Sequence, residues 1–195
     1  MTSSKKKEKY DLILDAALKV FAEHGFHRSQ VAKIAREAGV ADGTIYLYFK
    51  RKEDILICLF REQLGRLLQL AHDAIQDITD VKQALRTICE IHYTHLENNV
   101  DLAFVTQIEL RQSSLELRKE IGIAFKPYIE LVENVLHKGI EQNVFRPDLN
   151  VKLVRLLILG AIDEVVTSWL ISGQKYSLAA QVDGTVNFFL QGIDQ

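Results

Sequence analysis

Apolar residues recur at helical spacing from the start of the chain, and glycines interrupt the pattern. Over residues 9–24 the apolar positions lie three or four residues apart, which predicts an amphipathic helix; they are Ile13, Ala16, Ala17, Val20 and Phe21. Gly25 follows as the expected helix stop. We expect Ser29 at the N-cap of a second helix, whose apolar stripe is Val31, Ile34, Ala35 and Ala38. Gly39 closes that helix, where a left-handed residue is needed.

The rest of the chain continues the helical periodicity and contains only two prolines, Pro127 and Pro147. The pattern predicts seven more helices, over residues 44–49, 52–78, 80–98, 101–112, 114–143, 150–172 and 177–190. Asp80 and Asn150 are the expected N-caps of two of them, and a break is expected at Ser113–Ser114. The sequence therefore predicts an all-α protein with about nine helices.

The predicted helix over residues 44–49 is short and aromatic. Ile45 and Phe49 stand four residues apart and are expected to face inward. The outward face must then come from Thr44, Tyr46, Leu47 and Tyr48. Exposed side chains of this size are unfavourable in water unless a partner covers them. The major groove of DNA would do so, with hydroxyl groups on phosphates and side-chain edges on bases.

Charge is distributed unevenly along the chain. Residues 1–55 contain 11 Lys and Arg against 8 Asp and Glu, a net charge of +3, and the remainder contains 13 against 18, a net charge of −5. A basic end beside an acidic remainder suggests that only the first part meets a polyanion. The three lysines at positions 5–7 fit either an arm along phosphates or a solvated terminus.

The sequence favours a cytoplasmic protein. No stretch is long and apolar enough to cross a membrane, and residues 1–10 lack the apolar core of a signal peptide. The two cysteines, Cys58 and Cys89, lie in apolar segments, as expected for core residues in a reducing compartment.

Candidate catalytic and metal-binding residues are few, and we expect no enzyme and no metal. His92 and His95 stand three apart with Glu109 as a conceivable third ligand, but this is not a dedicated metal-site spacing. Asp163 and Glu164 are expected to be structural carboxylates rather than a general acid–base pair. The chain contains no P-loop, G-x-S-x-G or G-x-G-x-x-G motif.

The last two predicted long helices are too apolar to be buried by one chain alone. A four-helix bundle across a two-fold axis would cover both, and a symmetric dimer matches two half-sites on a palindrome. The residues expected in this interface are Leu157, Gly160, Ala161, Val165, Trp169, Val182, Val186 and Phe189.

Residues 7–60 resemble the DNA-binding domain of the TetR family of transcriptional repressors. The resemblance rests on Ala16–Ala17, Phe21, Gly25, Ile34–Ala35, Ala38–Gly39–Val40, Gly43–Thr44, Tyr46, Tyr48–Phe49, Lys52 and Leu56. It implies a helix-turn-helix DNA-binding domain over residues 1–51 and a ligand-binding and dimerisation domain over residues 52–195. It also implies base and phosphate contacts by Ser29, Gln30, Thr44, Tyr46, Leu47, Tyr48 and Lys52.

Three residues depart from the family pattern. Ala41 and Arg51 stand where the family often has helix-capping residues, and Asp42 stands where a polar or basic residue is common. Asp42 either favours the helix N-terminus or accepts a hydrogen bond from a cytosine amine.

The whole chain also resembles the FadR-type repressors of fatty-acid degradation, most clearly in QIELRQSSLELR, VADGTIYLYFKRKEDIL and IDEVVTSWL. That resemblance implies long-chain acyl-CoA as the inducer, with the acyl chain in a helical tunnel and the nucleotide near basic residues. The residues assigned to the ligand are Phe60, Leu64, Leu67, Ile88, His92, Leu96, Phe104, Ile108, Arg111, Arg118, Phe125 and Tyr128. Glu109 either forms ion pairs between two helices or holds an arginine at the pocket mouth.

The sequence thus favours a homodimeric repressor of fatty-acid degradation genes that long-chain acyl-CoA releases from a palindromic operator. Two alternatives stay open: a TetR-type repressor that senses another hydrophobic ligand, and a lipid- or acyl-CoA-handling protein that does not bind DNA.

Overall fold

The computed structural model describes residues 3–109, 111 and 114–195. Within these residues the chain forms nine α-helices, one π-helical segment and a 3₁₀ turn, without a β-strand. The predicted all-α fold is confirmed. The chain divides into two compact units, which are described separately: unit 1 is Met1–Gln63 with Asp101–Ala124, and unit 2 is Leu64–Val100 with Phe125–Gln195.

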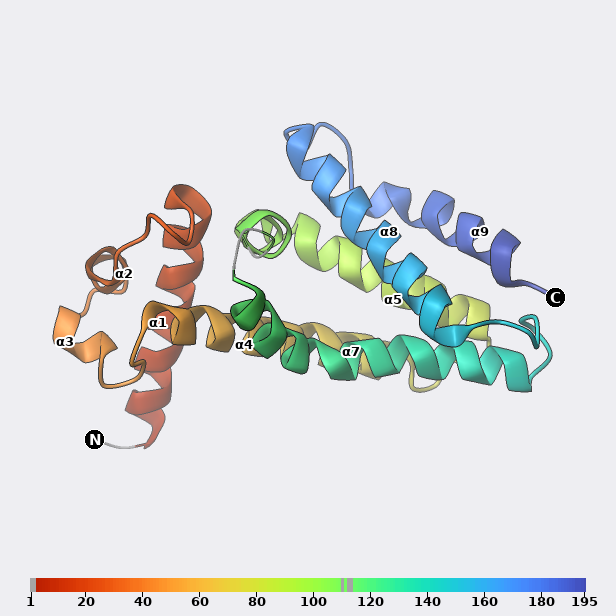
Figure 1. The fold of residues 1–195 in the computed structure, drawn as a ribbon, viewed down its shortest axis with the longest axis horizontal. Helices are drawn as coiled ribbons and strands as arrows, with labels where there is room; N and C mark the ends of the chain where they lie inside the picture. The colour runs from red at the N-terminus through yellow and green to blue at the C-terminus, as the bar shows by residue number, and fades with distance from the viewer. Residues whose placement is uncertain (1–2, 110, 112–113) are drawn as a thin grey trace. The chain divides into compact units, whose positions relative to one another are not determined.

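Unit 1 begins with three helices, α1 (Ser3–His24), α2 (Val31–Glu37) and α3 (Asp42–Ile45), which Figure 1 draws in red to orange. The predicted apolar stripes form its core. Phe21, Ile34 and Ile45 each expose 1% or less of their surface. Gly25 and Gly39 end the first two helices at φ 78° and 65°, a backbone region that side chains other than glycine rarely adopt. Both helix stops are therefore confirmed.

The third helix differs from the predicted 44–49 range. It starts two residues earlier, so Asp42 lies in its first turn, where a negative charge is favourable. It ends at Ile45, and the chain continues in tighter turns in which the Leu47 N–H bonds the Thr44 carbonyl and the Tyr48 N–H bonds the Ile45 carbonyl.

Unit 1 is completed by segments from later in the chain. These are the first half of α4 (Lys52–Ile75), helix α6 (Val100–Phe104), a π-helical segment (Val105–Glu109) and the start of α7 (Leu115–Glu141). The π-helical segment packs against α1. The end of the predicted 101–112 helix and the Ser113 half of the predicted Ser113–Ser114 break lie outside the described residues. Ser114 precedes the first residue of α7, and its Oγ accepts from the Leu117 N–H.

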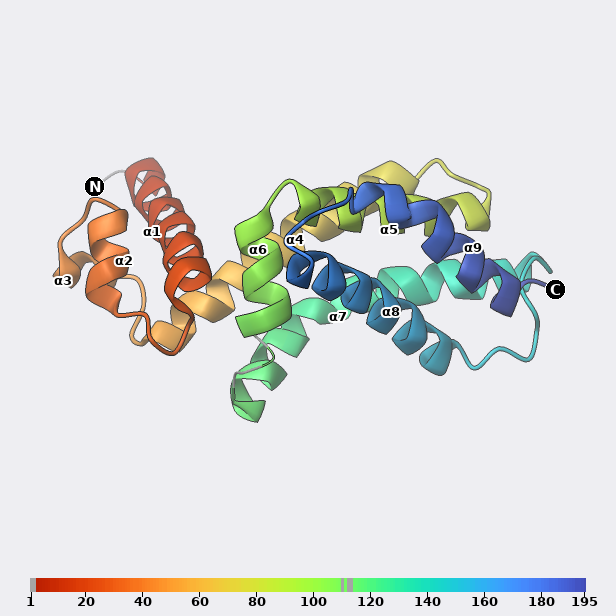
Figure 2. The same cartoon turned by 90° about the horizontal axis from the view of Figure 1, so that it is seen from above.

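Unit 2 contains α5 (Val81–Glu97), α8 (Val151–Ile171), α9 (Val182–Ile193) and the remainder of α4 and α7. Helix α5 packs against α9 and α8, and both Figure 1 and Figure 2 show these three helices side by side. The predicted caps are confirmed: Asp80 accepts from the N–H groups of Lys82 and Gln83, and Asn150 accepts from that of Leu153.

The last helix begins at Val182 rather than near residue 177, because a loop and the 3₁₀ turn Ala179–Gln181 precede it. The Glu97 carboxylate accepts from the backbone N–H groups of Leu178 and Ala179 and so caps that turn. In the described part of the chain, no helix has the length and apolarity needed to cross a bilayer.

Candidate DNA-binding and effector sites

The end of α3 and the turn after it present a large side-chain surface to solvent. Tyr46 exposes 59% and Leu47 exposes 78% of their surface, whereas Ile45 and Phe49 are buried at 1% and 3%. Thr44 and Tyr48 are half-buried. The inward pair is as predicted. Phe49 also stacks on Tyr10 of α1 at a centroid distance of 5.4 Å, which supports the turn from behind.

Lys52, the first residue of α4, is not directed to solvent. Its Nζ donates to the backbone carbonyls of Phe26 at 2.6 Å, His27 at 3.1 Å and Ser29 at 2.9 Å. An ammonium group has three N–H donors, so all of them are used. Partial burial lowers the pKa of Lys52. This geometry does not support the predicted phosphate contact of the Lys52 side chain, because a phosphate would have to displace a carbonyl.

Ser29 is also turned inward. Its Oγ donates to the carbonyl oxygens of Val20 and Gly25, and only 4% of the residue is exposed. The predicted N-cap role is wrong: Gln30 occupies the N-cap position of α2 and makes no side-chain cap. Gln30 is exposed, so its side chain, rather than the Ser29 hydroxyl, is available to a phosphate.

The unusual Arg51 at the start of α4 is compensated by Asp54. The Asp54 Oδ2 accepts from the backbone N–H groups of Lys50 and Arg51, and its Oδ1 accepts from the Arg51 Nε at 3.0 Å. Asp54 thus makes the reciprocal half of a capping box, in which a carboxylate in the first turn accepts from the backbone N–H of the N-cap residue; it does not bond the N–H groups that a capping serine at position 51 would bond. A carboxylate three residues into a predicted helix was the sequence signal for this cap.

A buried polar pair lies in the apolar interior of unit 2. His92 and Tyr128 expose 5% and 1% of their surface, and the His92 Nδ1 lies 3.1 Å from the Tyr128 hydroxyl. Burial, aided by His95, lowers the pKa of His92 to about 4, so the imidazole is neutral at pH 7. The ring of Phe125 lies 5.5 Å from that of Tyr128.

The second ring nitrogen of His92 has no partner in the described part of the chain, and neither has the buried Nε2 of His95. If the Tyr128 O–H donates to Nδ1, only the Nε2–H of His92 is left unpaired. The reverse arrangement would leave the tyrosine proton and the Nε2 lone pair both unpaired. We therefore assign the proton of His92 to Nε2. His92 then offers a buried N–H donor to a ligand.

The residues predicted to bind an effector fall in both units. Unit 2 contains Leu64, Leu67, Ile88, His92, Leu96, Phe125 and Tyr128, and unit 1 contains Phe60, Phe104, Ile108, Arg111 and Arg118. Most of the apolar members are buried, as a core or a tunnel would require. The two arginines are exposed, and Arg111 Nη2 lies 3.5 Å from the Gln107 Oε1. The two predicted roles of Glu109, in ion pairs between two helices or in holding an arginine at the pocket mouth, stay predictions.

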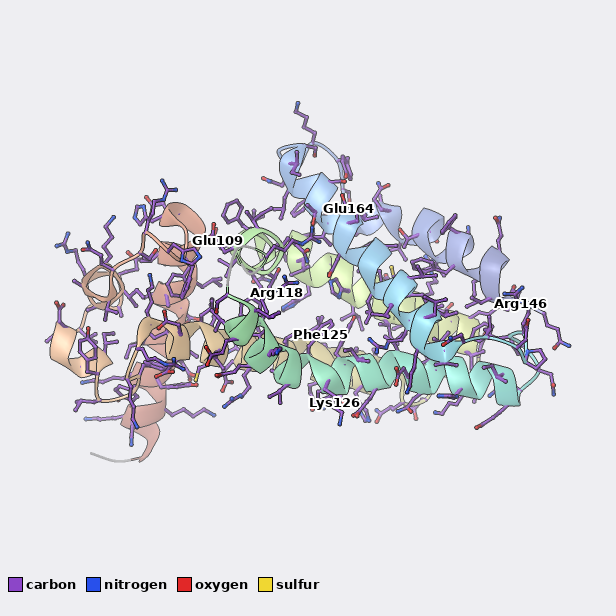
Figure 3. All side chains as sticks on the ribbon, in the orientation of Figure 1. Glu109, Arg118, Phe125, Lys126, Arg146 and Glu164 are labelled. Atoms are coloured by element: carbon purple, nitrogen blue, oxygen red, sulfur yellow. The ribbon has the colours of Figure 1, made fainter. Side chains whose placement is uncertain are left out.

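Glu109 makes a contact that the sequence did not suggest. Its Oε2 accepts from the backbone N–H of Phe26 at 2.8 Å, 83 residues away in the chain. Figure 3 labels Glu109 together with other charged side chains of both units. Among the described residues, no group of three His, Cys, Asp or Glu side chains is arranged to hold a metal ion.

The predicted dimer residues separate into two groups. Leu157 and Gly160 are exposed and Ala161 and Val165 are half-buried, so these four are available to a partner. The other four are core residues of the chain itself: Trp169, Val182 and Val186 expose 2–3% and Phe189 exposes 8%. The Trp169 Nε1 even donates to the Tyr176 carbonyl. This burial within the chain does not support their assignment to a dimer interface, which stays a prediction.

Leu157 and three side chains outside the predicted set form the exposed apolar face of α8 and α9. Leu153, Leu156 and Leu157 expose 51–62% and Phe188 exposes 74% of their surface. A groove of about 770 Å³ runs along this face and is lined in part by Leu153, Leu157, Ala161 and Phe188. We call these four exposed residues, Leu153, Leu156, Leu157 and Phe188, the α8–α9 face.

Two family models match the chain almost end to end. Residues 13–58 match the model of bacterial regulatory proteins of the tetR family, and residues 60–192 match that of the YsiA-like protein C-terminal region. The chain belongs to the TetR family. Gly25, Gly39 and the exposed turn after α3 all lie within the residues that match the tetR family model.

Individual TetR-family relatives are similar over the full length. The fatty acid metabolism regulator protein of Bacillus subtilis (strain 168) is 45% identical over 96% of this chain and 97% of its own length. The FadR structure from Bacillus halodurans superposes with a TM-score of 0.92 at 46% identity, covering 94% of this chain and 95% of that one. The Bacillus subtilis FadR structure, in complex with stearoyl-CoA, has the same TM-score at 45% identity and covers 94% and 99%.

Proposed function

We propose that the protein is a dimeric transcriptional repressor of fatty-acid degradation genes that long-chain acyl-CoA releases from its operator. The observation that carries this proposal is the full-length similarity, at 45% identity and a TM-score of 0.92, to a regulator whose structure contains stearoyl-CoA. A regulator that works on the bacterial chromosome would act in the cytoplasm. No catalytic step is needed for this function.

We propose that the DNA contacts come from the exposed α3 turn and the start of α2. Thr44, Tyr46, Leu47 and Tyr48 would enter the major groove, and Gln30 would meet the phosphate backbone. The exposure of Tyr46 and Leu47 supports this assignment. Residues 1–51 would carry this activity, and residues 52–195 would bind the effector and dimerise through the α8–α9 face on a palindromic operator.

The effector would bind among the helices of residues 52–195. The acyl chain would replace contacts between buried apolar side chains such as Leu67, Ile88 and Leu96. The unpaired Nε2–H of His92 would donate to the carbonyl oxygen of the thioester, since a buried donor without an acceptor is unfavourable. Exposed Arg111 and Arg118 would meet the phosphates of coenzyme A.

The test selects bound duplexes from a random-sequence DNA library and then titrates the complex with coenzyme A thioesters of increasing chain length. We expect a palindromic sequence, and release that strengthens with chain length because each buried CH₂ contributes ~0.8 kcal/mol. Free coenzyme A should release little DNA. An equal response at all chain lengths would refute the acyl effector, and failure to select any sequence would refute operator binding.

A pair of variants on α4 tests the location of the acyl chain. Leu64→Trp adds bulk at a half-buried position and should leave operator affinity intact while abolishing release. Leu70→Trp adds the same bulk on the same helix at a position that is 51% exposed, and it should respond like the unaltered protein. Normal release of the Leu64→Trp complex would place the acyl chain elsewhere.

A further inference from the structure

The loop between α1 and α2, residues 25–29, is held by two side chains of opposite charge. The Glu109 carboxylate accepts from the Phe26 N–H at 2.8 Å. The Lys52 ammonium donates to the Phe26 carbonyl at 2.6 Å and to the carbonyls of His27 and Ser29. Both polar groups of the Phe26 residue are therefore bound by charged partners, and hydrogen bonds of this kind are the strong ones.

The fit around this loop is close. Gly25 has φ 78°, and a Cβ added there would lie 3.3 Å from the Glu109 Oε2. The Phe26 ring is 3% exposed, packs edge-on against Phe21, and has the Lys52 ammonium 4.6 Å from its centroid. Glu109 itself is 7% exposed. The loop cannot move away from this buried carboxylate without breaking the hydrogen bond between the Phe26 N–H and the Glu109 Oε2.

The direction of the Glu109 side chain depends on an unusual piece of backbone. Glu109 is the last residue of the π-helical segment Val105–Glu109, and within it Val105, Gln107 and Glu109 are buried. A π-helical turn is rare and is frequently found at functional sites. Because an α-helix advances about 100° per residue, the one extra residue of a π-turn changes the side of the helix from which Glu109 projects.

The loop leads directly into the DNA-binding helices. Gln30 follows it as the N-cap of α2, and α2 packs on α3. A shift of the loop therefore moves the start of α2 and, through packing, the exposed turn after α3. The position of these elements decides whether side chains reach base edges and phosphates.

We infer that Glu109 and Lys52 are positioning residues for operator binding: they hold the 25–29 loop by its N–H and carbonyl groups and so set the geometry of α2 and α3. Neither side chain touches DNA. The inference goes beyond the proposed function, because it concerns the effector-free protein and holds whichever ligand the protein senses.

The test of Glu109 uses the full chain and the selected operator duplex. Glu109→Leu removes the acceptor and should speed hydrogen exchange of the Phe26 amide and weaken operator affinity about tenfold. Glu109→Gln keeps an acceptor oxygen and should lose much less. Asp101→Leu removes an exposed carboxylate from α6, also in unit 1, and should change neither quantity.

Two outcomes would overturn the role of Glu109. Unaltered Phe26 exchange in Glu109→Leu would show that the contact does not hold the loop in solution. Faster exchange with operator affinity kept, even if the thermal midpoint falls, would show that the contact is structural only. If Glu109→Leu does not fold, Glu109→Met, which also removes the acceptor oxygen but has a more adaptable side chain, decides the matter by the same two measurements.

Lys52→Met tests the positioning role of Lys52, because methionine keeps most of the apolar stem of the side chain and loses the ammonium group. The operator affinity should fall at every salt concentration, while the slope of its logarithm against that of salt concentration stays the same. A slope smaller by about one would show that the ammonium neutralises a phosphate. That result would overturn the positioning role of Lys52.

Discussion

Tyr46 exposes 59% of its surface although a tyrosine of this kind would gain stability from burial. Its exposure is explained if operator DNA covers it. Tyr46→Ala should therefore weaken specific operator binding by roughly 1–3 kcal/mol and leave the fold intact. Fluorescence anisotropy with the selected duplex measures this loss. Tyr176→Ala alters another exposed tyrosine, in unit 2, and should leave the affinity unchanged; equal affinities of the two variants would contradict the groove assignment.

His92 should make the stability of the protein depend on pH. Its pKa is about 4 in the folded protein and near 6.5 in an unfolded chain, so the unfolded state binds more protons between these values. Above pH 6.5 the imidazole is neutral in both states, and the stabilisation of the folded protein is fully present. As pH drops from 6.5 toward 4, the free energy of unfolding falls, because the unfolded chain takes up the proton first. With ~1.4 kcal/mol for each pH unit, the loss is up to about 3 kcal/mol.

Denaturant unfolding at several pH values measures this effect. His92→Gln keeps an acceptor for the Tyr128 hydroxyl but does not titrate. The difference between this variant and the unaltered protein in the pH dependence of the free energy of unfolding is therefore due to His92. Parallel profiles of the two proteins would show that His92 keeps an ordinary pKa in solution.

Residue type alone predicted some side-chain roles and not others. The inward positions of Ile45 and Phe49 follow from a four-residue spacing, and the structure confirms them. Lys52 and Ser29 have chemical groups that suit a phosphate, but the same groups also suit backbone carbonyls. The Lys52 partners lie in a loop 23 to 26 residues away, and a local pattern contains no information about that contact. The Ser29 partners, Val20 and Gly25, lie within nine residues, but residue type alone does not distinguish their carbonyls from a phosphate.

Helix α7 offers a test at the scale of a single element. A Cβ at Gly139 would overlap the ring of Phe145, which is fully buried, whereas a Cβ at Gly122 meets no atom within 4 Å. Gly139→Ala should therefore lower the free energy of unfolding by about 1–3 kcal/mol through overpacking. Gly122→Ala should raise it by up to about 1 kcal/mol, because alanine favours the helix.

Chemical denaturation of both variants and the unaltered protein provides the comparison. Because the two glycines share one helix and one substitution, intrinsic helix propensity is the same in each. A stabilised Gly139→Ala variant would show that Phe145 moves aside at little cost.

The elements were predictable where the chain itself signals their ends. Asp80, Asn150, Gly25 and Gly39 mark helix ends by capping chemistry or backbone freedom, and the structure confirms each. The π-helical segment Val105–Glu109 was not predictable, because one extra residue in a turn leaves the apolar spacing nearly unchanged. The early end of α3 also escaped prediction, since its last turn keeps the same inward residues in a tighter form.

The assembly prediction concerns the α8–α9 face. Phe188→Glu should give monomers, because dimerisation would bury an unpaired charge, and the dimer dissociation constant should rise at least about 100-fold. Ile123→Glu is the matched control, because both residues expose 74% of their surface and Ile123 lies in unit 1. Sedimentation velocity measures both. A dimeric Phe188→Glu variant would remove this face as the interface.

Half of the predicted interface residues are buried within the chain itself, and the packing of the whole molecule explains why. Helices α8 and α9 carry apolar residues on more than one side, so periodicity cannot tell which side faces the chain's own core and which faces a partner. Packing against α5 decides this, and it buries Val182 and Val186 while leaving Phe188 exposed. The sequence predicted that α8 and α9 carry more apolar residues than one chain can bury, but only the structure shows which of these residues are exposed.

The order of the two units along the chain has a consequence for synthesis. Unit 1 needs residues from Asp101–Ala124, including the Glu109 that holds Phe26, yet the ribosome makes Leu64–Val100 of unit 2 in between. Domains commonly fold as they emerge, first segment first. Here the helices of residues 3–63 are followed by some sixty further residues before the last segment of their unit has been made, so a nascent regulator gains its finished DNA-binding geometry only after the synthesis of Ala124.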